Sequence, residues 1–316
     1  IANRLPAIVG NVFHVRPVNG DDTNNNGLSP SQAYKTLAKA LDSATADQND
    51  VVILHSEGAA SAACTDYQSA TLDWNKDGVH LIGSGCGPMV SQRSRVALIS
   101  TYATASNLFT LSADNCLIRN IAFFAGVADA TVTGCFSLTG DRNVIENCHI
   151  AGIGADTNDI AGAYSLLLNG AAENVFRNCV IGLDTTTAGT AANSEILVDG
   201  AATRNAFIDC MILRQIEHAT NHPLVKLADA TAIDRWLLFK ECVFHSSSVN
   251  YTYGQVGVFK LAAAITQGEI ILRNCVATSG DRYSTTTKWC ADDRNNITVF
   301  GSVIPPADTQ GLGKLV

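Results

Sequence analysis

An all-β solenoid with coils of about 30 residues is the fold that the sequence predicts, on three observations. Between residues 147 and 275 an amide or acid followed by cysteine occurs five times, with successive cysteines 31, 31, 32 and 33 residues apart. Apolar and polar residues alternate with period two around each cysteine, which is typical of strands. A second apolar cluster precedes each of these strands. The five cysteines are Cys148, Cys179, Cys210, Cys242 and Cys275, and the preceding apolar cluster places Leu111, Leu138, Leu168, Val198, Leu227 and Leu261 in equivalent positions.

The chain begins with an apolar, proline-containing stretch that precedes any coil of the repeat. We expect residues 1–17 to form an N-terminal arm, of which residues 1–12 order against a neighbouring chain. The opening residues are too short and too interrupted by polar side chains for a signal peptide. The arm is therefore a candidate docking segment.

Residues 18–60 follow a different pattern, which predicts a cap and a first strand. Ser29 and Gln32 form a capping box with Pro30 at the first helical position, and apolar residues then recur at helical spacing. We expect a helix over residues 30–45 that plugs the open end of the solenoid. The apolar run at residues 51–54 is the first strand.

The loop from Asp22 to Gly27 resembles the first half of a calcium loop, with oxygen-bearing side chains at alternate positions. Ala33 occupies the twelfth position, where a bidentate Glu is needed. The pattern favours an ordinary Asn/Gly turn and leaves a calcium site open. We expect no metal and no cofactor in this chain.

The repeat region spans residues 61–300, and residues 301–316 form a C-terminal tail. The stretch from Leu117 to Phe123 matches the repeat with Ile121 in the cysteine position. Residues 78–83 form an earlier coil. No linker interrupts the repeats, so one elongated domain is expected.

The five repeat cysteines are expected to be free thiols in the core. Stacked cysteines lie about 4.8 Å apart with parallel side chains, whereas a disulfide needs about 3.8 Å between the β-carbons. This arrangement favours assembly in a reducing cytoplasm. The sequence leaves open whether Cys64 and Cys86 pair. The residue before each repeat cysteine is expected at an exposed or corner position, where stacked amides hydrogen-bond along the ladder.

Composition and charge exclude several classes of protein. The chain is 47% hydrophobic and 16% charged, which argues against disorder. Its net charge of −8 and scattered basic residues argue against nucleic acid as a partner. It contains no run of 18 apolar residues, so we expect no membrane span.

The first 85 residues also carry a resemblance to a known class. The blocks Phe13–Asp22, Gly27–Pro30, Ala33–Leu41 and Gly78–Gly83 resemble the opening of right-handed parallel β-helix proteins of the pectate-lyase-like class. With residues 4–10 in front, the chain resembles structural proteins of tailed-bacteriophage virions. The resemblance implies a right-handed β-helix and a head decoration or spike role.

Enzymes of this fold class place two or three carboxylates on a groove. The acids of the central coils are dispersed without a repeated pairing: Asp184, Asp199, Asp209, Glu217, Asp229, Asp234 and Glu241. His218 and His222 form the most reactive-looking cluster with Glu217, and we interpret them as loop residues. The aromatic content is low, at 7%, with Trp74, Trp236 and Trp289 as the tryptophans. We therefore predict no catalytic, cofactor-binding or metal residues.

The favoured hypothesis is a non-enzymatic virion protein that docks on the major capsid protein or another virion protein, after assembly in the host cytoplasm. A homo-oligomer is expected, with a trimer as the precedent. The alternatives are a tailspike-like polysaccharide depolymerase and an adhesin that binds host-surface glycans. The loops at residues 151–164, 182–195 and 245–256 depart most from the repeat and are the expected outward surfaces.

Overall fold

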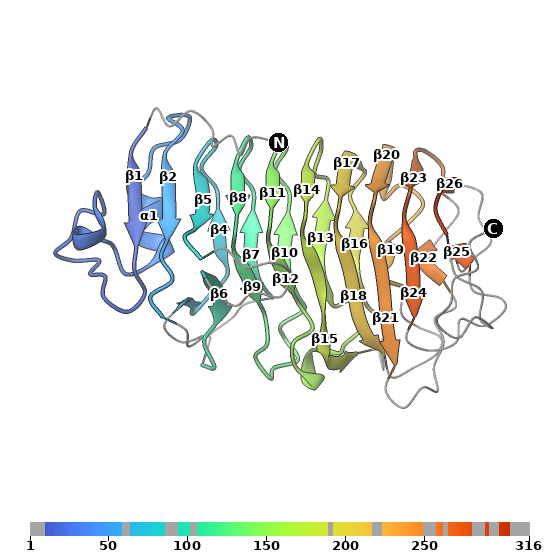
Figure 1. The fold of residues 1–316 in the computed structure, drawn as a ribbon, viewed down its shortest axis with the longest axis horizontal. Coiled ribbons are helices and arrows are strands. Elements are labelled where there is room, and N and C mark those ends of the chain that lie inside the picture. The colour runs from blue at the N-terminus through green and yellow to red at the C-terminus, as the bar shows by residue number, and fades with distance from the viewer. Residues whose placement is uncertain are drawn as a thin grey trace.

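The computed structural model describes residues 10–58, 64–85, 94–101, 106–188, 192–216, 223–248, 257–261, 265–279, 288–290 and 297–303. Within these ranges the strands form three parallel sheets, A, B and C, of ten, eight and eight strands. Each complete coil contributes one strand to each sheet, in the order A, B, C. Figure 1 shows the strands stacked side by side along the long axis of the molecule. The predicted all-β parallel solenoid is confirmed.

Sheet A contains β1 (Val12–Val15), β2 (Val51–Leu54), β5 (His80–Gly83), β8 (Leu117–Arg119), β11 (Val144–Glu146), β14 (Val175–Arg177), β17 (Ala202–Ile208), β20 (Ile233–Lys240), β23 (Glu269–Arg273) and β26 (Ile297–Phe300). Sheet B contains β3 (Thr65–Gln68), β6 (Arg95–Leu98), β9 (Ala122–Phe124), β12 (His149–Ala151), β15 (Val180–Ala188), β18 (Met211–Ile216), β21 (Val243–Ser248) and β24 (Val276–Ser279). Sheet C contains β4 (Leu72–Trp74), β7 (Asn107–Leu111), β10 (Gly134–Leu138), β13 (Tyr164–Asn169), β16 (Ser194–Asp199), β19 (Val225–Leu227), β22 (Gly257–Leu261) and β25 (Lys288–Cys290).

The register of sheet C agrees with the sequence repeat. The six apolar positions expected to be equivalent are direct neighbours across the sheet, from Leu111 through Leu138, Leu168, Val198 and Leu227 to Leu261. All six are buried. Sheet A supplies a facing column in which the rings of Phe176, Phe207 and Phe239 stack at 4.7 Å. One continuous apolar core therefore runs through the stacked coils.

The predicted helix over residues 30–45 is wrong in its first half. The structure has a short 3₁₀ turn, η1 (Pro30–Gln32), an extended stretch, and then α1 (Leu37–Ser43). Ser29 makes no capping hydrogen bond, and Thr36 is the cap instead, with its side chain accepting from the backbone N–H of Lys39.

Tyr34 explains why the helix begins late. Its backbone N–H donates to the His14 carbonyl and its carbonyl accepts from Arg16, both at 2.8 Å, so Tyr34 pairs with the edge of sheet A. Residues with extended sheet pairing cannot also be helical. The ring of Tyr34 packs over Gly27, where a β-carbon would lie 2.3 Å from the ring.

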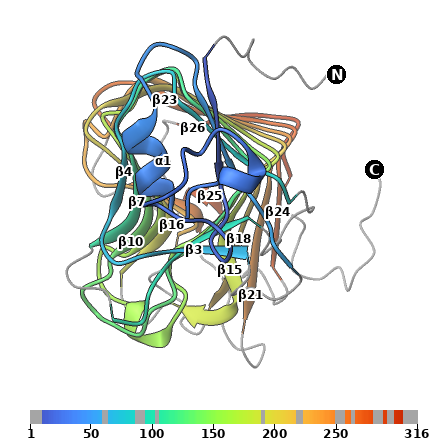
Figure 2. The same ribbon diagram turned by 90° about the vertical axis from the view of Figure 1, so that its left-hand side faces the viewer.

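Helix α1 lies at the N-terminal end of the solenoid, in front of the stacked coils in Figure 2. Its buried residues Leu37, Ala40 and Leu41 join the core beside β1 and β2. Its role as a plug and the right-handedness of the solenoid stay predictions. Among the described residues no helix has the length and apolarity to cross a bilayer.

Strand β1 corrects the expected extent of the arm. Val12–Val15 pair in parallel with Val51–Leu54, so sheet A begins inside the stretch that was assigned to residues 1–17. The alternation of Val12, Phe13, His14 and Val15 buries Phe13 and Val15 in the core. Residues 1–9 lie outside the described ranges.

Two ladders flank sheet A, one at each end of its strands. At the corner between sheets A and B, Asn120, Asn147, Asn178, Asp209, Glu241 and Asn274 all have positive φ, from 51° to 59°. The Asn178 amide donates to Asn147 at 2.6 Å, and that of Asn147 to Asn120 at 3.3 Å. The predicted corner position and amide ladder are confirmed there. Asn and Asp adopt this left-handed conformation more readily than most residues.

The cysteine beside each corner residue points into the core. All five repeat cysteines are buried free thiols, as predicted. The thiols of Cys179, Cys210, Cys242 and Cys275 donate to carbonyls of the preceding coil at 3.4–3.5 Å. Each thiol thus fills space and also binds a carbonyl.

A second ladder, of buried asparagines, lies where the chain enters sheet A. Asn143, Asn174 and Asn205 are fully buried. The side-chain oxygen Oδ1 of Asn174 accepts from the backbone N–H of Asn143 at 2.8 Å, and Oδ1 of Asn205 accepts from the backbone N–H of Asn174 at 3.0 Å. These three asparagines were not predicted to have a role from the sequence.

Candidate functional site

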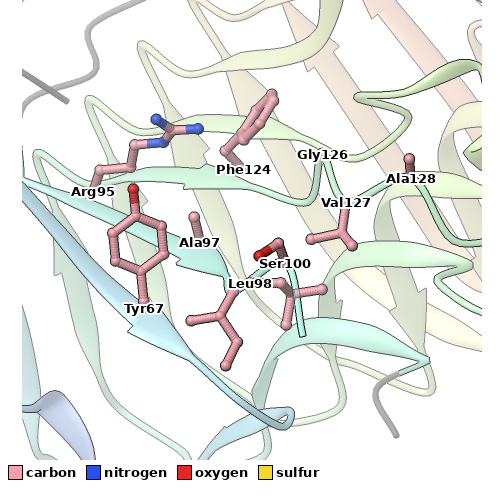
Figure 3. A pocket seen from close by; sticks show the side chains of 10 residues that line it. Tyr67, Arg95, Ala97, Leu98, Ser100, Phe124, Gly126, Val127 and Ala128 are labelled. Carbon is pink, nitrogen blue, oxygen red and sulfur yellow. The ribbon is translucent and has the colours of Figure 1, made fainter. Parts of the chain in front are cut away.

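A cleft of about 630 Å³ lies on the outer face of sheet B, over its N-terminal strands (Figure 3). Tyr67 of β3, Arg95 of β6 and Phe124 of β9 line it, together with apolar residues such as Leu98 and Val127. Tyr67 is 47% exposed, so part of its ring is open to solvent. We refer to this hollow as the sheet B cleft.

The register of three strands creates the sheet B cleft. Tyr67 pairs with Ala97, and Ala97 pairs with Phe124, so a small side chain stands between two rings. Side chains at paired positions point to the same face of a sheet. The gap above Ala97 therefore has an aromatic wall on each side.

Arg95 adds a cation to this aromatic surface. Its guanidinium carbon lies 4.3 Å from the centre of the Phe124 ring, within the range of a cation–π contact. Burial lowers the pKa of Arg95 from its ordinary value, although a guanidinium stays charged in proteins. The sheet B cleft can thus offer flat apolar faces and one positive charge to a ligand.

Stacked carboxylates occur in the structure, at the turn between sheets C and A. Asp77, Asp114 and Asp141 follow one another in consecutive coils. One oxygen of each accepts a backbone N–H of the next coil, from Asp114, Asp141 and Ala172, at 2.8 Å in every case. Arg142 also binds the second oxygen of Asp114 at 2.7 Å. These acids act as backbone acceptors in the turn.

The stacked acids Asp77, Asp114 and Asp141 were not singled out from the sequence, whereas the acids that were named are spread over the coils, as expected. Asp199 and Asp229 accept backbone N–H groups of their own turns, and Asp234 contacts Arg235 at 3.4 Å. Asp209 and Glu241 occupy equivalent positions in neighbouring coils, at the exposed corner between sheets A and B. That corner carries no residue of the sheet B cleft.

A pair of histidines on β1 and the end of β2 was not singled out from the sequence. Nδ1 of His14 and Nε2 of His55 lie 2.8 Å apart, so one ring donates to the other. Burial lowers the pKa of His14, and burial together with His14 and Arg16 lowers that of His55. The histidines expected to form a cluster, His218 and His222, lie with Glu217 outside the described residues.

The Asp22 loop is built from hydrogen bonds to the backbone. Asp22 accepts from the N–H groups of Lys35 and Thr36, at 2.7 and 3.1 Å, and from the Thr36 hydroxyl. Asp21 accepts from Thr23 and Asn24. In the described part of the chain, no group of three His, Cys, Asp or Glu side chains is placed to hold a metal ion.

The tryptophans do not line the sheet B cleft. Trp74 is fully buried and donates its indole N–H to the Val79 carbonyl at 2.8 Å. Trp289 packs against Phe244, and Trp236 is partly buried in β20. Cys64 is a buried free thiol, and Cys86 lies outside the described residues.

Comparison with known proteins shows the fold only. A scan against protein-family models found no match, and a search of curated proteins found none either. Among solved structures, the chain is similar to pectin methylesterase PemA from Erwinia chrysanthemi, at a TM-score of 0.58 and 12% identity over 94% of this chain and 90% of that one. It is also similar to a pectate lyase, at 0.54 and 11% over 93% and 80%. A third similar structure is ybhc of Escherichia coli, at 0.52 and 11% over 96% and 87%. The fold is therefore a pectate-lyase-like parallel β-solenoid.

Proposed function

We propose that this chain is a non-enzymatic structural protein of a bacteriophage particle, a capsid decoration or spike protein that docks on the major capsid protein or another virion protein. The observation that carries the proposal is how the stacked carboxylates are placed. Asp77, Asp114 and Asp141 are held by backbone N–H groups and Arg142, whereas glycoside hydrolysis needs two available carboxylates about 5 to 10 Å apart. The neighbouring acids Asp209 and Glu241 lie on an exposed corner outside the sheet B cleft.

The continuous ladders support a structural role. Buried amides, thiols and rings repeat over three to five successive coils in the middle of the array. Unfolding such an array exposes a core in which every coil depends on its neighbours. A rod of this kind suits the outside of a particle. We further propose that it is a homo-oligomer, with a trimer as the working model for light scattering to test.

Particle binding tests the proposal. A variant lacking residues 1–9 keeps β1 and is expected to fold with an unchanged circular dichroism spectrum. It should lose co-sedimentation with particles stripped of this protein. A matched truncation of residues 304–316 should retain it. If the native protein does not co-sediment with the particle, the virion role is wrong. If the variant without residues 1–9 still binds normally, the dock lies elsewhere in the chain.

A second candidate function, binding of host-surface glycans, is favoured by the sheet B cleft. Tyr67, Phe124 and Arg95 together offer sugar-stacking rings and a cation for an acidic group. The activities of the similar proteins, a pectin methylesterase and a pectate lyase, fit this alternative and the depolymerase alternative.

A glycan array separates the candidates. Glycan binding predicts that Tyr67→Ala and Phe124→Ala reduce retention at least tenfold. Phe300→Ala, at an exposed ring on sheet A, should change nothing. New reducing ends or unsaturated products from a retained polysaccharide would instead identify a depolymerase. If no glycan on the array is retained, the structural role is the one candidate that remains.

A further inference from the structure

One cation on the outer face of sheet B has no acidic partner in the described part of the chain. Six other arginines each contact a carboxylate: Arg16, Arg119, Arg142, Arg204, Arg214 and Arg235. Arg95 is partly buried on the wall of the sheet B cleft, yet its guanidinium forms neither an ion pair nor a hydrogen bond with a described residue. Buried charges in proteins are usually paired, because removing a charge from water is costly. An anion in the cleft would balance this charge.

A ring, rather than hydrogen bonds, positions the guanidinium of Arg95. Its carbon lies 4.3 Å from the centre of the Phe124 ring. Contact with a ring face leaves the N–H groups at the edge of the planar guanidinium free to donate. Gly126 leaves room for Phe124, since a β-carbon at Gly126 would lie 2.1 Å from the ring. The donors of Arg95 can therefore meet both oxygens of one carboxylate.

The space beside Arg95 has the width of a flat ring. Tyr67 and Phe124 flank Ala97 from the two neighbouring strands, and Figure 3 shows this arrangement. Because neighbouring strands lie about 4.8 Å apart, a ring over Ala97 would lie at a spacing from both strands at which aromatic rings pack. Arg95 stands two residues before Ala97 on β6 and so points to the same face. A carboxylate on such a ring would reach Arg95.

The rest of the cleft is apolar. Of its ten lining residues, only Tyr67, Arg95 and Ser100 carry a polar side-chain group. Figure 3 shows Arg95 and Tyr67 at one end of the cleft and Val127 and Ala128 at the other. A sugar filling this space would bury hydroxyls without partners, which weakens binding. An apolar body with one charged group fits better, and a volume of about 630 Å³ suits a small molecule.

We propose that the sheet B cleft binds a small aromatic monocarboxylate, with its carboxylate on the guanidinium of Arg95 and its ring over Ala97 beside Tyr67. The apolar remainder of the ligand extends toward Leu98 and Val127. This is the cleft named above for glycans, but the ligand class is different, and the virion role is not required. Glycan binding and binding of an aromatic acid therefore predict different orders of affinity.

Three probes test the site in calorimetric titrations of the full chain: naphthoate, naphthamide and glucuronate. Naphthoate carries both the ring and the carboxylate and should bind. Naphthamide keeps the ring without the charge, and glucuronate keeps the charge without the apolar body. Both should therefore bind at least tenfold more weakly than naphthoate.

A substitution at Arg95 tests which residue holds the carboxylate. Arg95→Gln should weaken naphthoate binding at least tenfold and leave naphthamide binding unchanged. The naphthamide measurement separates loss of the charge from loss of the fold. Arg177→Gln, at an exposed arginine on β14, is the matched control and should bind both probes as the native protein does.

Four results would overturn the proposal. Equal affinities of the native protein for naphthoate and naphthamide, or unchanged naphthoate binding by Arg95→Gln, would mean that Arg95 does not hold the carboxylate. Tighter binding of glucuronate than of naphthoate would assign the cleft to sugars. Absence of naphthoate binding would refute the site without affecting the virion role. The probes are compared on the native protein, so the test stands even if Arg95→Gln does not fold.

Discussion

The turns that flank sheet A and the loops that join sheet B to sheet C differ in how they satisfy the hydrogen bonds of buried polar groups. Around sheet A, Asn143, Asn174 and Asn205 satisfy the backbone of neighbouring coils. On the B–C side, polar groups are also buried, yet Arg214 and Asn158 keep atoms without partners among the described residues. The first region repeats and the second does not.

The difference teaches where such a fold can carry binding. A repeated turn gives every polar atom an identical partner one coil away, so nothing is left for a ligand. A loop that changes from coil to coil cannot form this ladder. Its polar groups and rings then have no matching partner in the next coil, as with the Nη atoms of Arg214 and the exposed ring of Tyr67.

The largest expected effect on stability comes from a substitution that breaks the ladder of buried asparagines. Asn174→Leu removes an acceptor for the N–H of Asn143 and the donor to the Gly140 carbonyl. Leaving these groups unpaired should lower the free energy of unfolding by about 4 kcal/mol. Asn158→Leu, equally buried but with one amide hydrogen bond to Asp129, should cost about 1–2 kcal/mol. Urea denaturation measures both, and equal costs would contradict the contrast.

A second effect concerns an acid inside the core. Asp66 of β3 accepts from the N–H of Leu37 and from Gln68, and burial raises its pKa to about 7. Between about pH 4 and 7 the folded state therefore holds a proton that the unfolded state has lost. The contribution of protonated Asp66 to the free energy of unfolding is fully present below about pH 4. It is lost as the pH rises to about 7.

Asp66→Asn should remove that loss. At pH 8 the variant should be more stable than the native protein by as much as about 4 kcal/mol, and the difference should vanish near pH 4. Chemical denaturation across this pH range measures it. Asp73→Asn, at an exposed acid on β4, serves as the control and should show no such dependence. An unchanged difference at both pH values would mean that Asp66 is not protonated in the folded state.

The corner between sheets A and B offers a smaller effect. Asn178 has a φ of 51°, which a β-carbon without a polar group disfavours. Asn178→Ala and Asn178→Gly both remove the hydrogen bond to Asn147. Only alanine adds backbone strain, so it should be about 1 kcal/mol less stable than glycine. Thermal unfolding compares the pair, and equal stabilities would argue against a strained corner.

The smallest effect is one of reactivity rather than stability. Burial and hydrogen bonding with neighbouring thiols hold the pKa of Cys179 and Cys210 well above the usual range. In a Cys86→Ser, Cys290→Ser background, a thiol reagent at pH 8 should label the repeat cysteines only at the rate of unfolding. Fast labelling in the native state would show that the core opens locally.

The sequence predicted the features that repeat. The spacing of Cys148 and Cys179 gave the coil length, and the position of Leu138 relative to Leu168 gave the register of sheet C. The corner role of Asn147 also followed, because its alternation with Cys148 required opposite directions. In each case the same environment recurs in the next coil, so a sequence pattern can report it.

Features that arise once were missed for the opposite reason. The late start of α1 depends on Tyr34 pairing with Val15, a contact across 19 residues that helical spacing cannot reveal. The sheet B cleft depends on which residue of β6 faces Tyr67. Asn143 and Asn174 had a visible signal, since both stand four residues before the corner residue of their coil. An asparagine that recurs at this fixed distance could have predicted the second, buried ladder.

A cryo-EM map of the native particle tests the central claim that this β-solenoid is structural. A structural role predicts rod-shaped density for this chain, repeated over the capsid or tail surface, with no sugar density at Asp209 and Glu241. A particle without the rod, together with an oligomer of the free protein that binds an oligosaccharide between two carboxylates, would contradict it.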